Sequence, residues 1–343
     1  MHLKVSFFST DNCYTEYLIK QYLQTSGQEP IYHDMWSQAL TGVRKHLLAY
    51  TEHSNLTILA ERPSGLGGSL FPKMDHLVCF MPGTIALAAT GGHTLAHAKA
   101  QPTWTADHDA QIALAHELTK TCWGMYKISK TGLSPEIAHF HVDNPAVLVA
   151  SEATPRPSPE ELSDDPDAAW RKDFDVHSGD RHNLQRPETV ESLFYMWRIT
   201  GDSKYREWGW EMFEAFEKWT LLEEVERDAD GNEIKQYSDD EDEESVRAKA
   251  AARVPLDMGK KYRGFSSVSD VDRIPPPTRD NMESFWLVCL SLPSNEPTNH
   301  PITLRTERHC SSIITTNTNT NTFLRPKHSN TSTSSSPTRT SSP

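Results

Sequence analysis

The chain has 343 residues, a formal net charge of −13 and no basic run, so a nucleic-acid-binding surface is not expected. Nine Trp, ten Tyr and twelve Phe can fill a sizeable core, in one large domain or two ordinary ones. No stretch reaches the roughly 18 apolar residues of a membrane span. The apolar run at residues 5–8 is too short for a signal peptide.

Apolar residues recur at helical spacing along most of the chain. This periodicity predicts helices at residues 14–24, 35–50, 107–127, 187–200 and 203–219, and another that starts at 281–287. Pro82 and Gly83 would kink or interrupt the apolar run at 79–89. Glycines at 65, 67 and 68 indicate a turn and match no phosphate-binding loop. Residues 143–180, rich in Pro, Asp and Glu, predict a long surface excursion.

Polar segments divide the later part of the chain. Residues 223–244 contain twelve Asp or Glu, which favours a solvated, disordered insert. A calcium loop is the alternative, but the order of acids in an EF-hand is missing. Residues 310–343 consist largely of Ser, Thr, Asn and Pro and are expected to be disordered. We therefore predict an all-α fold of paired helices, either a bundle or a closed toroid, since no short repeat suggests a solenoid.

One helix start carries two acids on the same face. Pro187 occupies a first-turn position, where its missing N–H is tolerated, and Glu188 and Glu191 follow three residues apart. Acids at a helix start commonly do no more than complement the helix dipole. Paired carboxylates are also what acid–base chemistry requires, and the spacing alone leaves both readings open.

Five cysteines occur, none in a C-x-x-C pair, so a zinc site is not expected. Cys79 and Cys122 both fall in apolar helical patterns. They could form a disulfide in an oxidising compartment or remain two buried thiols, and composition does not decide between these.

Several long motifs, in order, resemble glycoside hydrolase family 47, the class I α-1,2-mannosidases that trim N-linked glycans. The resemblance covers roughly residues 11–222 and 263–287. It rests on YLIKQY (17–22), KMDHLVCFMPGT (73–84), TGLSPEI (131–137), RHNLQRPETVES (181–192) and MESF (282–285).

The resemblance implies an (α/α)7 barrel, or toroid, of paired helices. Members of the family hydrolyse terminal α-1,2-linked mannose of high-mannose oligosaccharides with inversion and bind calcium (Ca2+) at the barrel floor. Inversion requires one carboxyl group to protonate the leaving oxygen and another to activate a water. Family membership would place the protein in the secretory pathway, in the endoplasmic reticulum or Golgi, with a high-mannose oligosaccharide or glycoprotein as its partner.

The matching motifs also assign roles to residues. Glu188 resembles the general base, Glu136 an acidic active-site position and Asp11 the catalytic aspartate. Cys79 and Cys122 match the disulfide of the family. His76, Arg186 and Glu191 resemble sugar- or calcium-supporting positions, and Phe285 resembles the aromatic platform under the sugar. Without the resemblance, His76 would be interpreted as a hydrogen-bonded structural histidine and Glu136 as an acidic residue in a loop near a helix end.

The chain departs from the family pattern at three places. An upstream general acid has no counterpart in residues 1–10, and Asp11 to Glu16 is one residue longer than in the family, about 100° on a helix. Cys289 stands where a glutamate is expected, and the Thr-Glu segment whose Thr binds calcium is not found. We therefore expect a partial toroid, truncated at both ends.

These departures define the expected domains and two functions. Residues 1–10 would precede an incomplete catalytic domain at 11–287, interrupted by an acidic insert at about 223–262 and followed by a disordered tail at 288–343. The first function is α-1,2-mannosidase activity. The alternative is an inactive mannosidase-like remnant that binds glycan or a protein partner.

Overall fold

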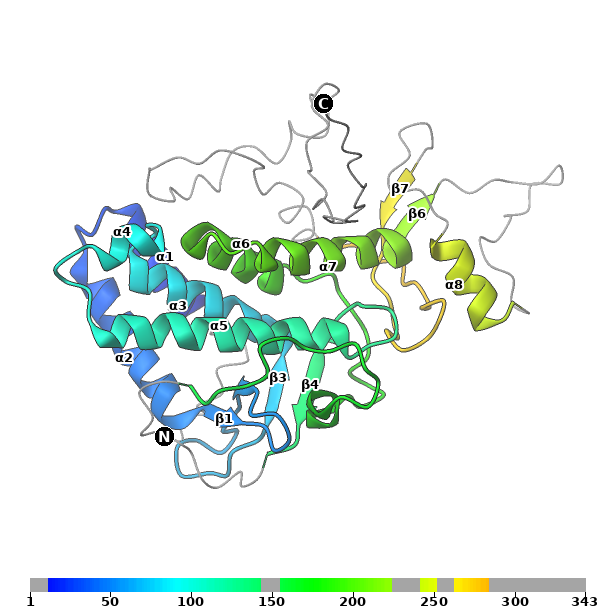
Figure 1. Ribbon diagram of the computed structural model, residues 1–343, viewed down its shortest axis with the longest axis horizontal. Coiled ribbons are helices and arrows are strands. Elements are labelled where there is room, and N and C mark those ends of the chain that lie inside the picture. The colour runs from blue at the N-terminus through cyan, green and yellow to red at the C-terminus, as the bar shows by residue number, and fades with distance from the viewer. Residues whose placement is uncertain (1–11, 143–154, 224–240, 252–261, 284–343) are drawn as a thin grey trace, which may run out of the picture.

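The structure, a computed structural model, describes residues 12–142, 155–223, 241–251 and 262–283. Helices dominate it (Figure 1). Chain order gives α1 (Asn12–Gln24), α2 (Pro30–His46), α3 (Met81–Thr90), α4 (Leu95–Lys99), α5 (Ala106–Lys127), α6 (Glu188–Thr200), α7 (Lys204–Thr220) and α8 (Glu243–Ala251). None of these helices is long and apolar enough to cross a bilayer.

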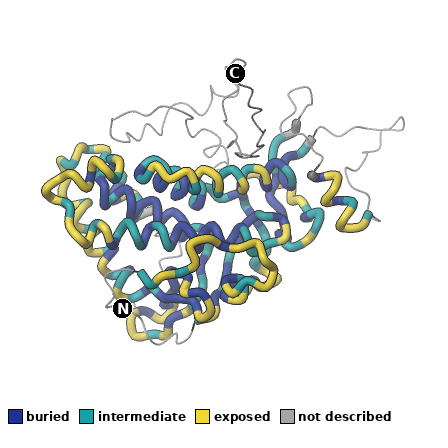
Figure 2. The backbone as a smooth tube through the Cα atoms, viewed as in Figure 1, coloured by how far each residue is buried: buried dark blue, intermediate teal, exposed yellow. Residues whose placement is uncertain are grey.

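Helix α3 lies at the centre of the helical packing. Nine of the ten residues of α3 are buried, as expected for a helix that is apolar on all sides. Helix α3 packs against both α5 and α6, while α1 pairs with α2 and α6 with α7. Figure 2 shows the buried backbone concentrated along α3 and α5, with exposed residues on the outer helices. The predicted all-α class and its partial α/α arrangement are confirmed.

Chemistry at the helix ends explains several boundaries. Gly201 ends α6 in the left-handed conformation at φ 76°, which lets the chain turn directly into α7. Thr105 and His108 form a capping box at the start of α5. The apolar residues that recur along 203–219 form the core-facing side of α7, where Met212, Phe216 and Trp219 are buried.

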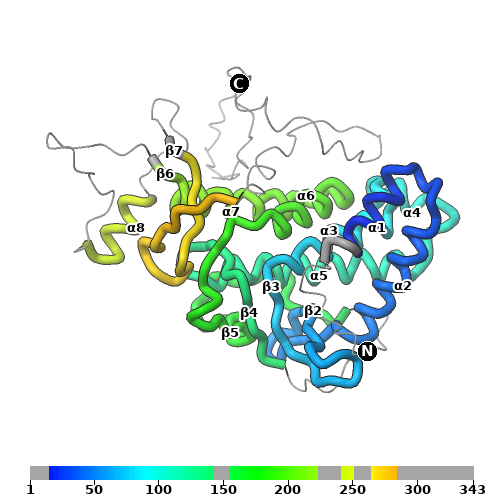
Figure 3. The backbone as a smooth tube through the Cα atoms, turned by 180° about the vertical axis from the view of Figure 1, so that it is seen from behind, coloured from blue at the N-terminus to red at the C-terminus, as the bar shows by residue number. Residues whose placement is uncertain are grey.

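Short strands, which the sequence did not predict, lie beside the helices. Strands β1 (Leu48–Tyr50) and β2 (Thr57–Leu59) form one antiparallel pair. Strands β3 (Lys73–Asp75), β4 (Ile137–Phe140) and β5 (Phe174–Asp175) form a three-stranded sheet below α5 (Figure 3). The 3-10 helices η1 (His76–Phe80) and η2 (Ala169–Asp173) adjoin that sheet.

Two sequence predictions are corrected at this level. The helix expected at 35–50 ends at His46, because residues 48–50 turn into a strand that buries its apolar side chains. The excursion expected on the surface at 143–180 is anchored where it is described: Leu162 and Trp170 lie in the core. Lys120 of α5, almost fully buried, holds the same segment by donating to Ser158 Oγ (2.7 Å) and the Pro159 carbonyl (2.8 Å).

The acidic insert begins and ends at paired strands. Strand β6 (Leu221–Glu223) pairs antiparallel with β7 (Tyr262–Phe265), so the two ends of the segment meet. Where the segment is described, it forms α8, which packs against α7 and buries Val246, so this part is not disordered. The disorder predicted at 224–240, the tail at 288–343 and most of the helix predicted at 281–287 lie outside the described residues.

Candidate active site

The site is assembled where β3, β4 and α6 meet. His76 directly follows β3 and Glu136 directly precedes β4, and the register of these strands makes the two residues neighbours. The His76 N–H donates to the Glu136 carbonyl at 2.8 Å. Glu188 opens α6, so its carboxylate lies at the positive end of the helix dipole. Three distant segments thus bring these residues together.

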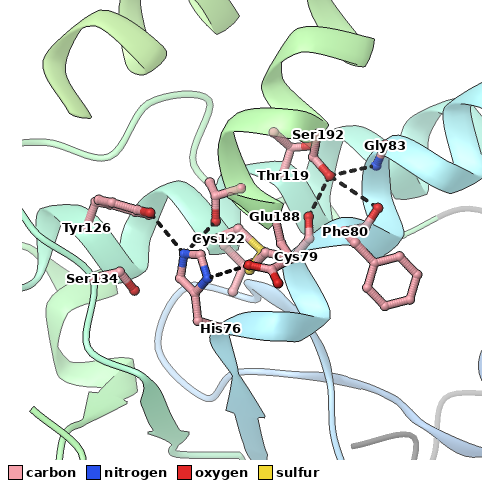
Figure 4. The surroundings of a disulfide bond; sticks show 12 residues. His76, Cys79, Phe80, Gly83, Thr119, Cys122, Tyr126, Ser134, Glu188 and Ser192 are labelled. Atoms are coloured by element: carbon pink, nitrogen blue, oxygen red, sulfur yellow. Dashed lines mark hydrogen bonds and ion pairs between the residues drawn. A yellow bond between two sulfur atoms is a disulfide. The ribbon is translucent and has the colours of Figure 1, made fainter. Parts of the chain in front are cut away.

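His76 forms the buried centre of this arrangement (Figure 4). Its Nε2 lies 2.9 Å from the Tyr126 hydroxyl and 3.1 Å from Thr189 Oγ1. On the other side of the ring, Nδ1 lies 3.4 Å from Glu188 Oε2. Both of those atoms are buried, and neither makes a hydrogen bond within the described part of the chain. The imidazole therefore lies between two hydroxyl groups, on Tyr126 and Thr189, and the Glu188 Oε2 atom, which has no hydrogen-bond donor among the described residues.

Glu136 is held in a fixed position by a backbone donor and an arginine. Its Oε1 accepts from the Leu184 N–H at 3.0 Å, and its Oε2 pairs with Arg186 Nε. The side chain is largely buried. Burial alone would lower the pKa of the Arg186 guanidinium. The negative charges of Glu136 and, more weakly, Glu188 outweigh that effect, so the pKa is raised. Arg186 and Glu136 therefore form a persistent ion pair.

Glu191 lies one helical turn along α6 and faces α1. Lys20 Nζ donates to Glu191 Oε1 at 2.7 Å and also pairs with Glu16 one turn earlier on its own helix. Burial would lower the pKa of Lys20, but Glu191 and Glu16 raise it overall. Burial and Glu191 raise the pKa of Glu16. One lysine is thus shared between two carboxylates, and it ties α1 to α6.

The disulfide lies next to His76. Cys79 in η1 and Cys122 in α5 are bonded, with Cα atoms 5.8 Å apart, as the family resemblance implied (Figure 4). Beside it, Ser192 Oγ donates to the Cys79 carbonyl and accepts from the Gly83 N–H at 2.9 Å. These contacts fix the start of α6, and therefore Glu188, against η1 and α3.

The structure brings five of the residues singled out in the sequence into this region: His76, Glu136, Arg186, Glu188 and Glu191. Asp11 and Phe285 lie outside the described residues. Sequence reasoning did not identify the partners Lys20, Tyr126 and Thr189. For Lys20, the Glu16–Lys20 spacing of four residues on one helix face was an available signal. Nothing local in the sequence pairs Tyr126 or Thr189 with His76.

Comparison with known proteins agrees with these features. Residues 3–288 match the model of Glycosyl hydrolase family 47. The chain therefore belongs to this family.

Three curated relatives show how much of the family the chain represents. A mannosyl-oligosaccharide 1,2-alpha-mannosidase of Candida albicans is 40% identical over 283 residues, which are 81% of this chain and 40% of that protein. Endoplasmic reticulum mannosyl-oligosaccharide 1,2-alpha-mannosidases of Saccharomyces cerevisiae and Homo sapiens are 36% and 37% identical. These matches cover 82% and 80% of this chain, and 43% and 28% of the relatives. The chain spans less than half the length of these relatives.

A solved structure shares the fold. An alpha-1,2-mannosidase from Trichoderma reesei superposes with a TM-score of 0.54 at 21% sequence identity. The match covers 83% of this chain and 45% of that chain. At this identity the likeness concerns the arrangement of helices alone.

Proposed function

We propose that this chain carries part of the catalytic centre of an inverting α-1,2-mannosidase, which hydrolyses terminal α-1,2-linked mannose of high-mannose N-glycans. The observation that carries the proposal is the convergence of His76, Glu136 and Glu188 from three distant segments in a member of family 47. A glycosidase centre needs carboxyl groups held in unlike environments. Glu136 is paired with Arg186, whereas Glu188 Oε2 has no hydrogen-bond donor in the described region.

The geometry and the family motifs together suggest a role for each residue of the site. Glu188 is assigned as general base through the family motif. Its Oε2 is buried beside His76 Nδ1, so an attacking water would give its proton to the other carboxylate oxygen. His76 would orient the Glu188 carboxylate. The ion pair with Arg186 would hold the Glu136 carboxylate in place near it. Glu191 is assigned to substrate support. Asp11 as the catalytic aspartate and Phe285 as an aromatic platform under the sugar remain assignments from the family motifs.

Calcium is assigned through the family and not through the described residues. Ca2+ takes six to eight oxygen ligands. The described residues contain one group of three His, Cys, Asp or Glu side chains close enough to share an ion, and two of its members are histidines. These residues do not fit a calcium site, and no step of the proposed reaction passes through the ion.

The compartment and domain organisation are proposed on the same basis. Relatives from yeast and human carry endoplasmic reticulum in their names, which supports placement in the secretory pathway, in the endoplasmic reticulum or Golgi. An oxidising lumen also suits the Cys79–Cys122 disulfide. The proposed catalytic region is 11–287, with the acidic insert at about 223–262.

Mannose release from an α-1,2-linked oligosaccharide, with and without a chelator, tests the activity. We expect Glu188→Gln to reduce release by about a hundredfold or more, the range for loss of a general base. Glu207→Gln is a matched control, since Glu207 is also a first-turn acid, on α7, and is exposed. Equal turnover in both variants would contradict the assignment. Glycan binding without turnover in the unmodified chain would favour the alternative, a non-enzymatic remnant that binds glycan or a protein.

A further inference from the structure

A second cluster of potential ligands lies near the candidate active site but does not include its residues. His139 lies on β4, and His177 and Asp180 lie in the segment between β5 and α6. One potential ligand atom from each of the three residues lies within 4.8 Å of the others. Asp180 Oδ2 is 3.3 Å from His139 Nε2 and 3.7 Å from His177 Nδ1.

One of these separations matches that between two ligands of a tetrahedral ion, and the other is slightly longer. With metal–ligand distances of about 2.0–2.1 Å, two ligands of a tetrahedral zinc site lie about 3.3 Å apart. The His139–Asp180 distance already has this value, and the His177–Asp180 distance exceeds it by a few tenths of an ångström. The imidazole rings of the two histidines stack, with centroids 3.9 Å apart. His177 therefore has to turn to direct Nδ1 at an ion, and its side chain, 54% exposed, has room to do so.

A carboxylate behind one histidine completes the pattern. His177 Nε2, the nitrogen on the other side of the ring, lies 3.2 Å from Asp175 Oδ2. Histidines that bind metal through one nitrogen usually donate the other N–H to a carboxylate, which fixes the tautomer and strengthens the ligand. Asp175 can do this for a metal bound at Nδ1 by following the turn of His177, since its side chain is half exposed.

We propose that His139, His177 and Asp180 bind a divalent cation of the zinc type, with water as the fourth ligand. Two imidazole nitrogens and one carboxylate suit zinc and exclude a typical calcium site, which requires oxygen ligands. The sequence did not predict a zinc site, because no C-x-x-C pair occurs; this cluster supplies His and Asp ligands from separate segments instead. The site is therefore separate from the calcium implied by the family.

The position of the cluster gives the ion a structural role. The Asp180 carbonyl accepts from the Glu136 N–H at 3.0 Å, and His139 lies on the strand that Glu136 precedes. An ion here would join β4 to the segment that leads into Arg186 and Glu188. Binding would thus stiffen the connection between the two carboxylates of the candidate active site.

Titration of the full, metal-stripped chain with Zn2+ tests the proposal, with Co2+ as a spectroscopic probe of tetrahedral coordination. We expect one Zn2+ whose affinity falls at least about tenfold in His177→Ala and, through the loss of the supporting carboxylate, in Asp175→Asn. His97→Ala is a matched control, because the rings of His93 and His97 also lie close together, with centroids 4.5 Å apart, and are not part of the ligand group found. It should leave Zn2+ affinity unchanged.

Two outcomes would overturn the proposal. One is His177→Ala binding Zn2+ as tightly as the unmodified chain, which would place the ion elsewhere. The other is equal loss in His97→Ala and His177→Ala, which would indicate nonspecific surface binding. Because His177 is half exposed, its replacement should not prevent folding. The readout is metal affinity, so the result does not depend on whether the chain cleaves mannosides.

Discussion

His76 connects a carboxylate to two hydroxyl groups in the protein interior. Replacement by Leu would leave the buried Glu188 Oε2 beside an apolar side chain and would deprive the Tyr126 hydroxyl of a partner. A buried polar group that loses its partner costs about 1–3 kcal/mol. We expect His76→Leu to lower the free energy of unfolding by about 3 kcal/mol, measured by urea denaturation.

Tyr126→Phe provides the comparison for this prediction. It removes one hydroxyl, while His76 Nε2 keeps Thr189 Oγ1 as a partner. The expected loss is about 1 kcal/mol, the usual net value of one hydrogen bond. Equal losses in the two variants would show that Glu188 draws no stability from the imidazole.

A second histidine gives stability a pH dependence. His116 on α5 lies 2.8 Å, through Nδ1, from the Tyr205 hydroxyl of α7. Burial, reinforced by Lys204 and Lys120 against the weaker effect of Glu117, lowers its pKa to about 4 from 6.5. The unfolded chain therefore binds more protons between pH 6.5 and 4, so stability is lost as the pH falls through this window.

The size of this effect can be measured by denaturation at two pH values. Between pH 6.5 and 5 the loss attributable to His116 is on the order of 2 kcal/mol. His116→Asn should weaken this dependence, leaving the contributions of other groups. An unchanged dependence in the variant would show that His116 titrates normally in the folded chain.

At the scale of single residues, the sequence identified the carboxylates better than their partners. His76, Glu136 and Glu188 lie in short contiguous motifs that match the family, so the family resemblance was enough to locate them. Tyr126 and Thr189 are 50 and 113 residues from His76. Contacts over such separations depend on how helices pack, and no local pattern encodes them.

Among the elements, α3 and α6 approach most closely at Gly83. A Cβ built there would lie 2.8 Å from Ser192 Cα and 2.9 Å from a ring carbon of Tyr195, too close for either to remain in place. The Gly83 N–H also donates to Ser192 Oγ. We expect Gly83→Ala to destabilise the fold by about 1–3 kcal/mol, as overpacking of a core does.

Gly42→Ala on α2 tests the same change where there is space. No atom lies within 4 Å of the built Cβ, and the position is inside a helix. Alanine should stabilise the chain by up to about 1 kcal/mol, because glycine is the poorer helix former. Thermal unfolding should therefore shift in opposite directions for the two variants. An upward shift in both would indicate that helix propensity, and not the contact at Ser192, governs position 83.

Long elements were predictable and short ones were not. The helices at 107–127, 187–200 and 203–219 match α5, α6 and α7 closely, because each repeats its apolar pattern over several turns. The strands have two to four residues each among those described, too few for alternation to appear. Residues 48–50 continued the apolar pattern of the preceding helix, so the sequence could not separate β1 from α2.

Across the whole molecule, the disulfide links η1 to α5 over a sequence separation of 43 residues. Closing a loop of this length restricts the unfolded chain by an amount equivalent to about 4 kcal/mol in the chain-entropy model. We expect Cys79→Ala combined with Cys122→Ala to lower the unfolding midpoint in denaturant accordingly. A reductant should destabilise the unmodified chain and leave the double variant unaffected. Sensitivity of the double variant to reductant would point to another disulfide.

The pairing of β3 with β4 determines where the chain tolerates changes of length. Residues alternate sides along a strand, so one extra residue between Thr131 and Ile137 would bring Pro135 opposite His76 and turn the Glu136 carboxylate away. Between Pro155 and Ala168, which form neither helix nor strand, the same insertion would leave the strand register unchanged, with the Lys120 contacts as a tether. Length variation among related proteins should therefore concentrate after Phe140, and the short path from Thr131 to Glu136 should keep its residue count.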